Sequence, residues 1–211
     1  AENHAWKLDR VLRRTSPAGL LESYHIERST AADENIREST RSTDFMAPNS
    51  KQEERLRKAV LALAKETEFG KRMVNGGRLS VPTMYESPLS TPDGDHWLGG
   101  PRPGTSMPDA PVTVADGRIS FLTDAFITQG SGFMLLKFGH GDGTGAGEGR
   151  GLIRIGGDDG LTDSEGLASA RYDAQPGTAY LLRPDGYVAA RFRKPTRAAI
   201  DAALARASGI N

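Results

Sequence analysis

The stretch Phe133-Met134-Leu135-Leu136-Lys137-Phe138 decides the fold of the second half of the chain. A continuous apolar run of this length is typical of a central strand that is buried on both faces. Residues 151–155 and 179–182 have the same character. Before a further strand at 187–192, Arg183-Pro184-Asp185-Gly186 predicts a tight turn, because proline presets the bend and glycine accepts a positive φ. We therefore expect a sheet that closes with a hairpin.

Two helices are expected to flank these strands. Residues 121–126 predict a short helix ahead of the first central strand, and Pro195-Thr196 begins a closing helix that ends at Gly209. Strands that alternate with helices indicate an α/β arrangement. Residues 112–211 are therefore expected to form a small α/β domain.

Residues 1–80 are expected to be helical. Residues 1–14 have apolar side chains at three- and four-residue spacing, which predicts a helix with one buried stripe: Ala5, Leu8, Val11 and Leu12. A second helix, with a polar second half, is expected over 17–43. A third is expected to run from Ser50 to Asn75-Gly76-Gly77. Ser50 and Glu53 fit a capping box, in which the two side chains satisfy each other's free backbone N–H groups.

Prolines and glycines set residues 81–111 apart. Proline lacks a backbone donor and has a fixed φ, so this stretch cannot be a regular helix or a central strand. It is expected to be an extended linker or a wrapping segment, and it marks the best domain boundary. The predicted organisation is α+β: a helical segment over 1–80, a Pro/Gly-rich linker over 81–111, and an α/β domain over 112–211.

Composition excludes several classes of function. The 211 residues include 27 basic and 27 acidic side chains, so the net charge gives no reason to expect nucleic acid or an anionic membrane as partner. The chain has no cysteine, which excludes thiol catalysis and thiolate metal sites. No apolar run approaches the roughly 20 residues of a membrane span. Residues 1–8 lack the apolar core of a signal peptide. A cytoplasmic protein is expected.

The glycine-rich residues 139–149 follow the first central strand and must be weighed as a phosphate loop. A Walker loop ends in lysine and a hydroxyl residue, whereas Arg150-Gly151 follow here, and a Rossmann loop opens a helix, whereas 151–155 predicts a strand. The acidic residues 156–160 lack the spacing of a calcium loop. We expect a surface loop and an ordinary acidic turn. The histidines are scattered, so no metal site is expected: His4, His25, His96 and His140. No serine lies in a G-x-S-x-G context, so no hydrolase triad is expected, and no catalytic residue is assigned.

Several segments of the chain carry a resemblance to a known family: the three described below, with residues 35–45 and 74–80 continuing the likeness. Residues 1–8 (Ala-Glu-Asn-His-Ala-Trp-Lys-Leu) resemble its "DAxNLAWKLA" segment, with His4 where leucine is usual. Residues 20–28 resemble its "LLDSYxxER" helix, and residues 182–191 resemble the "LVRPDGxVAWR" hairpin of its thioredoxin-like C-terminal domain. The family is the class A flavoprotein monooxygenases, in particular the phenol hydroxylase-like and 3-(3-hydroxyphenyl)propionate hydroxylase-like group.

The resemblance implies that the chain is the C-terminal portion of an enzyme that uses FAD, NAD(P)H and O2 to hydroxylate a phenolic ring. In that family, the segment matched by residues 1–8 follows a glycine-rich stretch that touches the flavin. The FAD- and substrate-binding half is therefore expected upstream, as a missing partner, and residues 1–80 are expected to complete it. This chain alone is expected to carry no cofactor. Asn3 is the one candidate for a contact with the flavin-binding loop, although packing is the more natural role for Asn3 and Trp6.

A thioredoxin-like domain without cysteine is expected to be structural. Tyr24 and Arg28 lie four residues apart on one helical face and are expected to fasten that helix to the missing half. Apolar stripes left uncovered would favour a homo-oligomer. The alternative hypothesis is a free-standing, redox-inactive thioredoxin-like interaction module.

Overall fold

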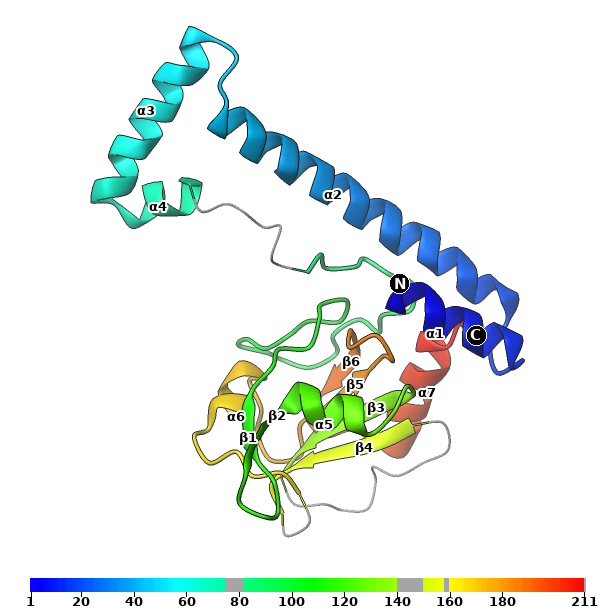
Figure 1. Ribbon diagram of the computed structural model, residues 1–211. Coiled ribbons are helices and arrows are strands. Elements are labelled where there is room, and N and C mark those ends of the chain that lie inside the picture. Colours follow the sequence, from blue (N-terminus) through cyan, green and yellow to red (C-terminus); the bar gives the residue numbers. More distant parts are fainter. Residues whose placement is uncertain (75–81, 140–149, 158–159, 211) are drawn as a thin grey trace. The chain divides into compact units, whose positions relative to one another are not determined.

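A computed structural model of the chain describes residues 1–74, 82–139, 150–157 and 160–210 (Figure 1). The chain forms two compact units. The first combines Ala1–Glu27 with Met84–Asn211, and the second is Arg28–Thr83. The helix end expected at 75–77, most of the glycine-rich loop (140–149) and residues 158–159 of the acidic turn lie outside the described residues.

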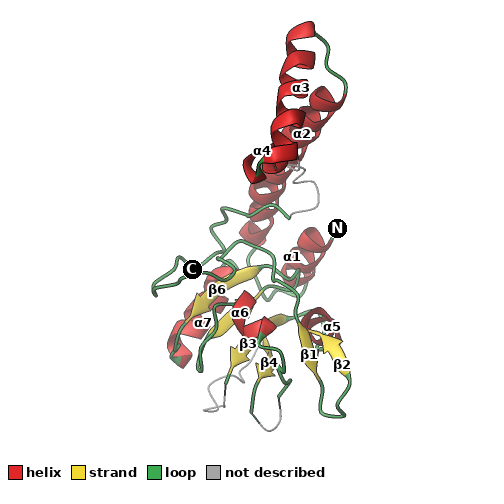
Figure 2. Cartoon of the chain, turned by 90° about the vertical axis from the view of Figure 1, so that its left-hand side faces the viewer, coloured by secondary structure: helices red, strands yellow, loops and turns green. Residues whose placement is uncertain are grey.

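The first unit is built on a four-stranded sheet in the order β4-β3-β5-β6 (Figure 2). Its strands are β3 (Phe133–Phe138), β4 (Arg150–Ile155), β5 (Ala179–Leu182) and β6 (Val188–Phe192). β3 and β4 are parallel, and β5 is antiparallel to both β3 and β6. The predicted strands and hairpin are confirmed. This order, with a closing helix, is that of the expected thioredoxin-like domain, and the α+β class is confirmed.

Helices cover both faces of the sheet, which explains the continuous apolar runs. On β3, Met134, Leu136 and Phe138 pack in one core with α5 (Leu122–Thr128) and α6 (Leu167–Arg171). Phe133 and Leu135 face the other way, toward α7 (Arg197–Ala207), as alternation along a strand requires. A small antiparallel pair, β1 (Pro111–Thr113) and β2 (Ile119–Phe121), precedes α5.

Helix α1 (Glu2–Leu12) joins the second of these cores, because Trp6 packs edge-on against Phe133 at 5.7 Å between ring centroids. The expected helix is present, but the expected buried stripe is wrong. Ala5, Leu8 and Leu12 are exposed, and the buried residues of α1 are Asn3, Trp6 and Lys7. The physical reason is that partners for the polar face come from distant parts of the chain. A 3-10 turn (η1, Ala18–Leu21) leads into α2 (Glu22–Met46).

The second unit contains most of α2 together with α3 (Lys51–Glu66) and α4 (Glu68–Val74). The capping box of Ser50 and Glu53 is confirmed. The single helix expected from Ser50 onward is instead broken at Thr67. The backbone of Thr67 is extended, and its hydroxyl accepts a hydrogen bond from Gly70 N at 3.0 Å, which starts a new helix.

The Pro-rich stretch from Met84 onward wraps the first unit and covers the outer edge of β6. Thr91 N donates to Ala189 O, and Gly104 N donates to Val188 O, both at 2.8 Å. Val188 N in turn donates to Thr105 O. Covering an edge strand removes a template for unwanted pairing. The domain bounds at 80 and 111 stay a prediction. The contacts within the chain place residues 1–27 in one unit with residues 84–211, and residues 28–83 in another.

Candidate functional site

A buried cluster of charged and polar side chains lies where α1, the start of α2 and the β5–β6 turn meet. Its members share near-complete burial: Asn3 (8% exposed), Trp6 (6%), Lys7 (0%), Glu27 (1%) and Arg183 (1%), with the Asp185 side chain at 2%. They come from three of the segments on which the sequence resemblance rests, 1–8, 20–28 and 182–191. We call this cluster the Arg183 network.

Arg183 is the centre of the network and binds two carboxylates. Its Nη1 and Nη2 donate to Oε1 and Oε2 of Glu27 at 2.7 and 3.0 Å. Its Nε and Nη2 donate to Oδ1 and Oδ2 of Asp185 at 3.0 and 2.7 Å. Two-point pairing suits the planar guanidinium and fixes direction as well as distance. Arg183 therefore orients the first turns of α2 against the turn that follows β5.

Helix α1 supplies the remaining donors. Lys7 Nζ lies 2.8 Å from Glu27 Oε2, and Trp6 Nε1 donates to Asp185 Oδ2 at 3.0 Å. Asn3 Nδ2 donates to Glu27 Oε2 at 2.6 Å and to Asp185 Oδ2 at 3.1 Å. One face of α1 is thus fixed to both carboxylates.

The charges of the network balance, since Lys7 and Arg183 are cationic and Glu27 and Asp185 are anionic. Burial by itself would raise the pKa of Glu27. The hydrogen bonds and charges of Arg183 and Lys7 outweigh burial and lower the pKa of Glu27 to about 2. Glu27 is therefore ionised at neutral pH and has no proton to give or take in that range.

Aromatic rings surround the guanidinium of Arg183. Its Cζ lies 5.2 Å from the ring centroid of Trp6, 5.6 Å from that of Tyr187 and 5.9 Å from that of Tyr85. Tyr85 and Tyr187 stack on each other at 4.4 Å. These rings add cation–π attraction and keep water from the ion pairs.

A second group of side chains fastens the wrapping segment to β6. Arg191 forms a two-point pair with Asp93, at 2.8 Å from Nε and 2.6 Å from Nη2, and also donates to Gly99 O. Trp97 lies between two cations, 4.4 Å from Arg191 and 3.8 Å from Arg193. The charged side chains Arg191 and Asp93 are paired within the unit, whereas Trp97 Nε1 is buried without a hydrogen-bond partner. The ion pairs of this group hold the wrapping segment on the sheet.

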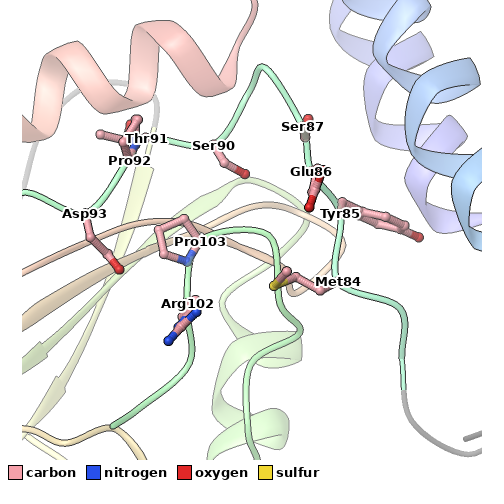
Figure 3. A pocket seen from close by; sticks show the side chains of 10 residues that line it. All are labelled: Met84, Tyr85, Glu86, Ser87, Ser90, Thr91, Pro92, Asp93, Arg102 and Pro103. Carbon is pink, nitrogen blue, oxygen red and sulfur yellow. The ribbon is translucent and has the colours of Figure 1, made fainter. Parts of the chain in front are cut away.

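A shallow hollow of about 390 Å³ lies within the wrapping segment, lined from 84–93 and 102–103 (Figure 3). The hydroxyls of Ser90 and Thr91 are buried there without a hydrogen-bond partner. A flavin dinucleotide site needs a glycine turn that opens a helix under the pyrophosphate. The hollow is lined by a proline-rich loop and has no such turn, so it does not fit FAD.

The predicted site residue Asn3 is held inside the network. Its amide nitrogen is used by Glu27 and Asp185, and its Oδ1 is buried without a hydrogen-bond partner. A contact between Asn3 and the flavin-binding loop stays a prediction. The network itself was not predicted from the sequence, although each member lies in a segment of the resemblance. The burial of a lysine or a glutamate can be predicted only when the residues that pair with it in the folded chain are known.

Other kinds of site receive no support from the described part of the chain. It contains no group of three or more metal-ligating side chains. In the same residues, no helix has the length and apolar content required to cross a bilayer. His4 packs its ring against that of Tyr24, at 4.7 Å between centroids, which is a packing role.

The fold defines an α+β domain of thioredoxin-like topology, and the chain has no cysteine. The chain belongs to the family described as "Aromatic-ring hydroxylase, C-terminal", whose model matches residues 100–210. It is 35% identical over 212 residues to the aklavinone 12-hydroxylase RdmE of Streptomyces purpurascens, an alignment that covers 94% of this chain and 36% of RdmE.

Two solved structures have a fold similar to that of this chain. The flavin-dependent monooxygenase PieE, in complex with FAD and substrate, matches with a TM-score of 0.74 at 21% identity, over 100% of this chain and 43% of PieE. The aromatic hydroxylase CabE, from angucycline biosynthesis, matches with a TM-score of 0.69 at 25% identity, over 99% of this chain and 39% of CabE. The chain thus spans well under half the length of these relatives.

Proposed function

We propose that this chain is the C-terminal structural portion of a flavin-dependent monooxygenase that hydroxylates an aromatic substrate with NAD(P)H and O2. FAD, once bound in such an enzyme, supplies the oxygen-transfer chemistry. The residues present here hold a scaffold together. The FAD- and substrate-binding half is the proposed partner of this chain.

The observation that carries the proposal is the Arg183 network. It joins three of the segments by which the chain resembles this family, and its two cations and two carboxylates pair with one another in near-complete burial. A catalytic acid or base needs a pKa near the working pH. Glu27, with a pKa of about 2, does not meet this requirement. The network therefore supports a role in architecture.

The free-standing interaction module is the weaker hypothesis, because family membership and the length of the relatives both favour a part of a larger enzyme. One simple measurement distinguishes the two hypotheses. The 211-residue chain and the protein that includes the preceding coding sequence are purified side by side, and the visible absorbance of oxidised flavin and the oxidation of NADH and NADPH are measured.

We expect flavin and NAD(P)H oxidation in the longer protein alone. Stoichiometric flavin on the 211-residue chain would contradict the structural role. A longer protein that never takes up flavin, even when FAD is added, would contradict the proposed function as a whole and favour the interaction module.

A further inference from the structure

The hollow in the wrapping segment lies between two limbs of that segment, residues 84–93 and 102–104. Thr91 N donates to Ala189 O and Gly104 N donates to Val188 O, both at 2.8 Å, so neighbouring residues of β6 anchor the two limbs. Tyr85 N donates to Gly104 O, also at 2.8 Å, and joins the limbs to each other. Main-chain hydrogen bonds therefore hold the walls of the hollow in place.

The polar centre of the hollow is the hydroxyl of Ser90. Its oxygen is buried and makes no hydrogen bond among the described residues. Figure 3 shows this hydroxyl directed into the space bounded by Glu86, Pro103 and Met84. A Cβ on Gly104 would lie 3.6 Å from the Ser90 oxygen, so the glycine leaves room beside the hydroxyl. A buried hydroxyl without a partner is costly, and a ligand that satisfies it gains affinity.

The groups around Ser90 determine which ligand satisfies its hydroxyl. A serine hydroxyl both donates and accepts hydrogen bonds, whereas an ionised carboxylate such as that of Glu86 only accepts. Glu86 is exposed at the rim of the hollow. A ligand hydroxyl suits both groups, because it accepts from Ser90 and donates to Glu86, and a hydrogen bond to a carboxylate is a strong one.

The rest of the lining favours an aromatic ring. The thioether of Met84 is of the kind that contacts aromatic rings favourably. Pro103 adds an apolar ring, and Arg102, exposed beside it, adds a cation that attracts aromatic faces. The volume of about 390 Å³ lies near the lower end of the range for ligand pockets, about 300 to 1,000 Å³, and suits a small molecule.

We propose that this hollow binds a small phenol, with the ring between Met84 and Pro103 and the phenolic hydroxyl between Ser90 and Glu86. The site lies within the first unit, and it does not depend on the flavin. The inference goes beyond the proposed function, because it gives the C-terminal portion a binding site of its own. Phenol binding here and flavin binding by the longer protein are measured separately, so either can fail without the other.

The test uses the 211-residue chain with ¹³C in the methyl groups of its 5 methionines. Phenol is titrated in while the methyl resonances are followed by NMR, and Met84→Leu identifies the Met84 resonance. Toluene, which has the ring without the hydroxyl, is titrated in the same way. Ser90→Ala removes the hydroxyl of the site. Ser39→Ala, at an exposed serine of α2, is the matched control.

We expect phenol to shift the Met84 resonance in a saturable way, through the ring current of the bound molecule. Toluene should bind the wild type about fivefold or more weakly than phenol does, and Ser90→Ala should lose a similar factor for phenol, because a hydrogen bond is lost in each case. Ser39→Ala should bind phenol as the wild type does.

Two results would overturn the proposal. The first is a Met84 resonance that phenol leaves in place, or that moves without saturation together with those of the other methionines. The second is equal affinity for phenol and toluene, or equal affinity of Ser90→Ala and the wild type for phenol, which would show an apolar surface without a specific site.

Discussion

Arg183 and Glu27 lie 156 residues apart in the sequence and form a two-point ion pair at 2.7 and 3.0 Å, with side chains that are 1% and 0% exposed. A buried ion pair is weak evidence for high stability, because desolvation offsets much of the attraction. The pair matters here because it fixes how two segments of the chain are oriented relative to each other. It fixes one register between the start of α2 and the turn after β5, and Lys7 and Asn3 bring α1 into the same arrangement.

Acid should destabilise the first unit through Glu27. The pKa of Glu27 in the folded chain, about 2, lies below its ordinary value of 4.5. The resulting stabilisation is therefore fully present above pH 4.5 and is lost as the pH falls from 4.5 toward 2, by about 3 kcal/mol in total. Denaturant unfolding of the wild type and of Glu27→Gln across this range should give curves that converge on acidification. A constant gap between them would contradict the assignment.

Loss of Arg191 should loosen the wrapping segment. Arg191→Leu removes the pair with Asp93 and the bond to Gly99 O, and it takes one cation from the ring of Trp97. We expect faster cleavage between 93 and 100 in limited proteolysis followed by mass spectrometry, because local opening then costs less. The exposed Arg102, changed to leucine, serves as the control. Equal cleavage in the two variants would show that the segment is held by its backbone hydrogen bonds instead.

Two glycines with a positive φ allow the cost of backbone strain to be compared with the cost of a steric clash. Gly117 has a φ of +84° and open space where a methyl group would lie, whereas a Cβ on Gly104, at φ +92°, would lie 2.1 Å from Tyr85 O. Gly117→Ala should cost about 1–2 kcal/mol from strain alone. Gly104→Ala should cost about 1–3 kcal/mol more, since the backbone of the wrapping segment must move. Chemical unfolding of both variants measures the difference, and equal costs would mean that the segment yields freely.

The sheet could be predicted because its strands are buried on both faces, which leaves a continuous apolar run such as 133–138. The turn after β5 could be predicted as well, since Gly186 does take a positive φ, of 74°. The capping box of α3 depends on neighbours in sequence and was also predictable. These features share one property, in that the residues that determine them are close together in the chain.

The features that escaped prediction depend on distant partners. Apolar spacing identified Leu8 and Leu12 as a face made for burial, yet it could not say that the first unit would instead cover Asn3 and Lys7. The two carboxylates that make this possible lie at 27 and 185. The break of the helix at Thr67 could not be predicted for a different reason. One hydroxyl, that of Thr67, starts α4 inside an otherwise continuous helical pattern.

A double-mutant cycle on Glu27 and Arg183 in the 211-residue chain tests most directly whether this ion pair holds the N-terminal helices to the C-terminal domain. Glu27→Gln and Arg183→Met should each cost about 3–5 kcal/mol, because each leaves a buried charge without its main partner. Guanidinium unfolding of the wild type, both single variants and the double variant gives the coupling between the two sites. We expect a coupling of about 3 kcal/mol, the upper range for residues in contact. Additive costs, within about 0.5 kcal/mol, would mean that Arg183 does not fix the N-terminal helices to the C-terminal domain, and would contradict the central claim.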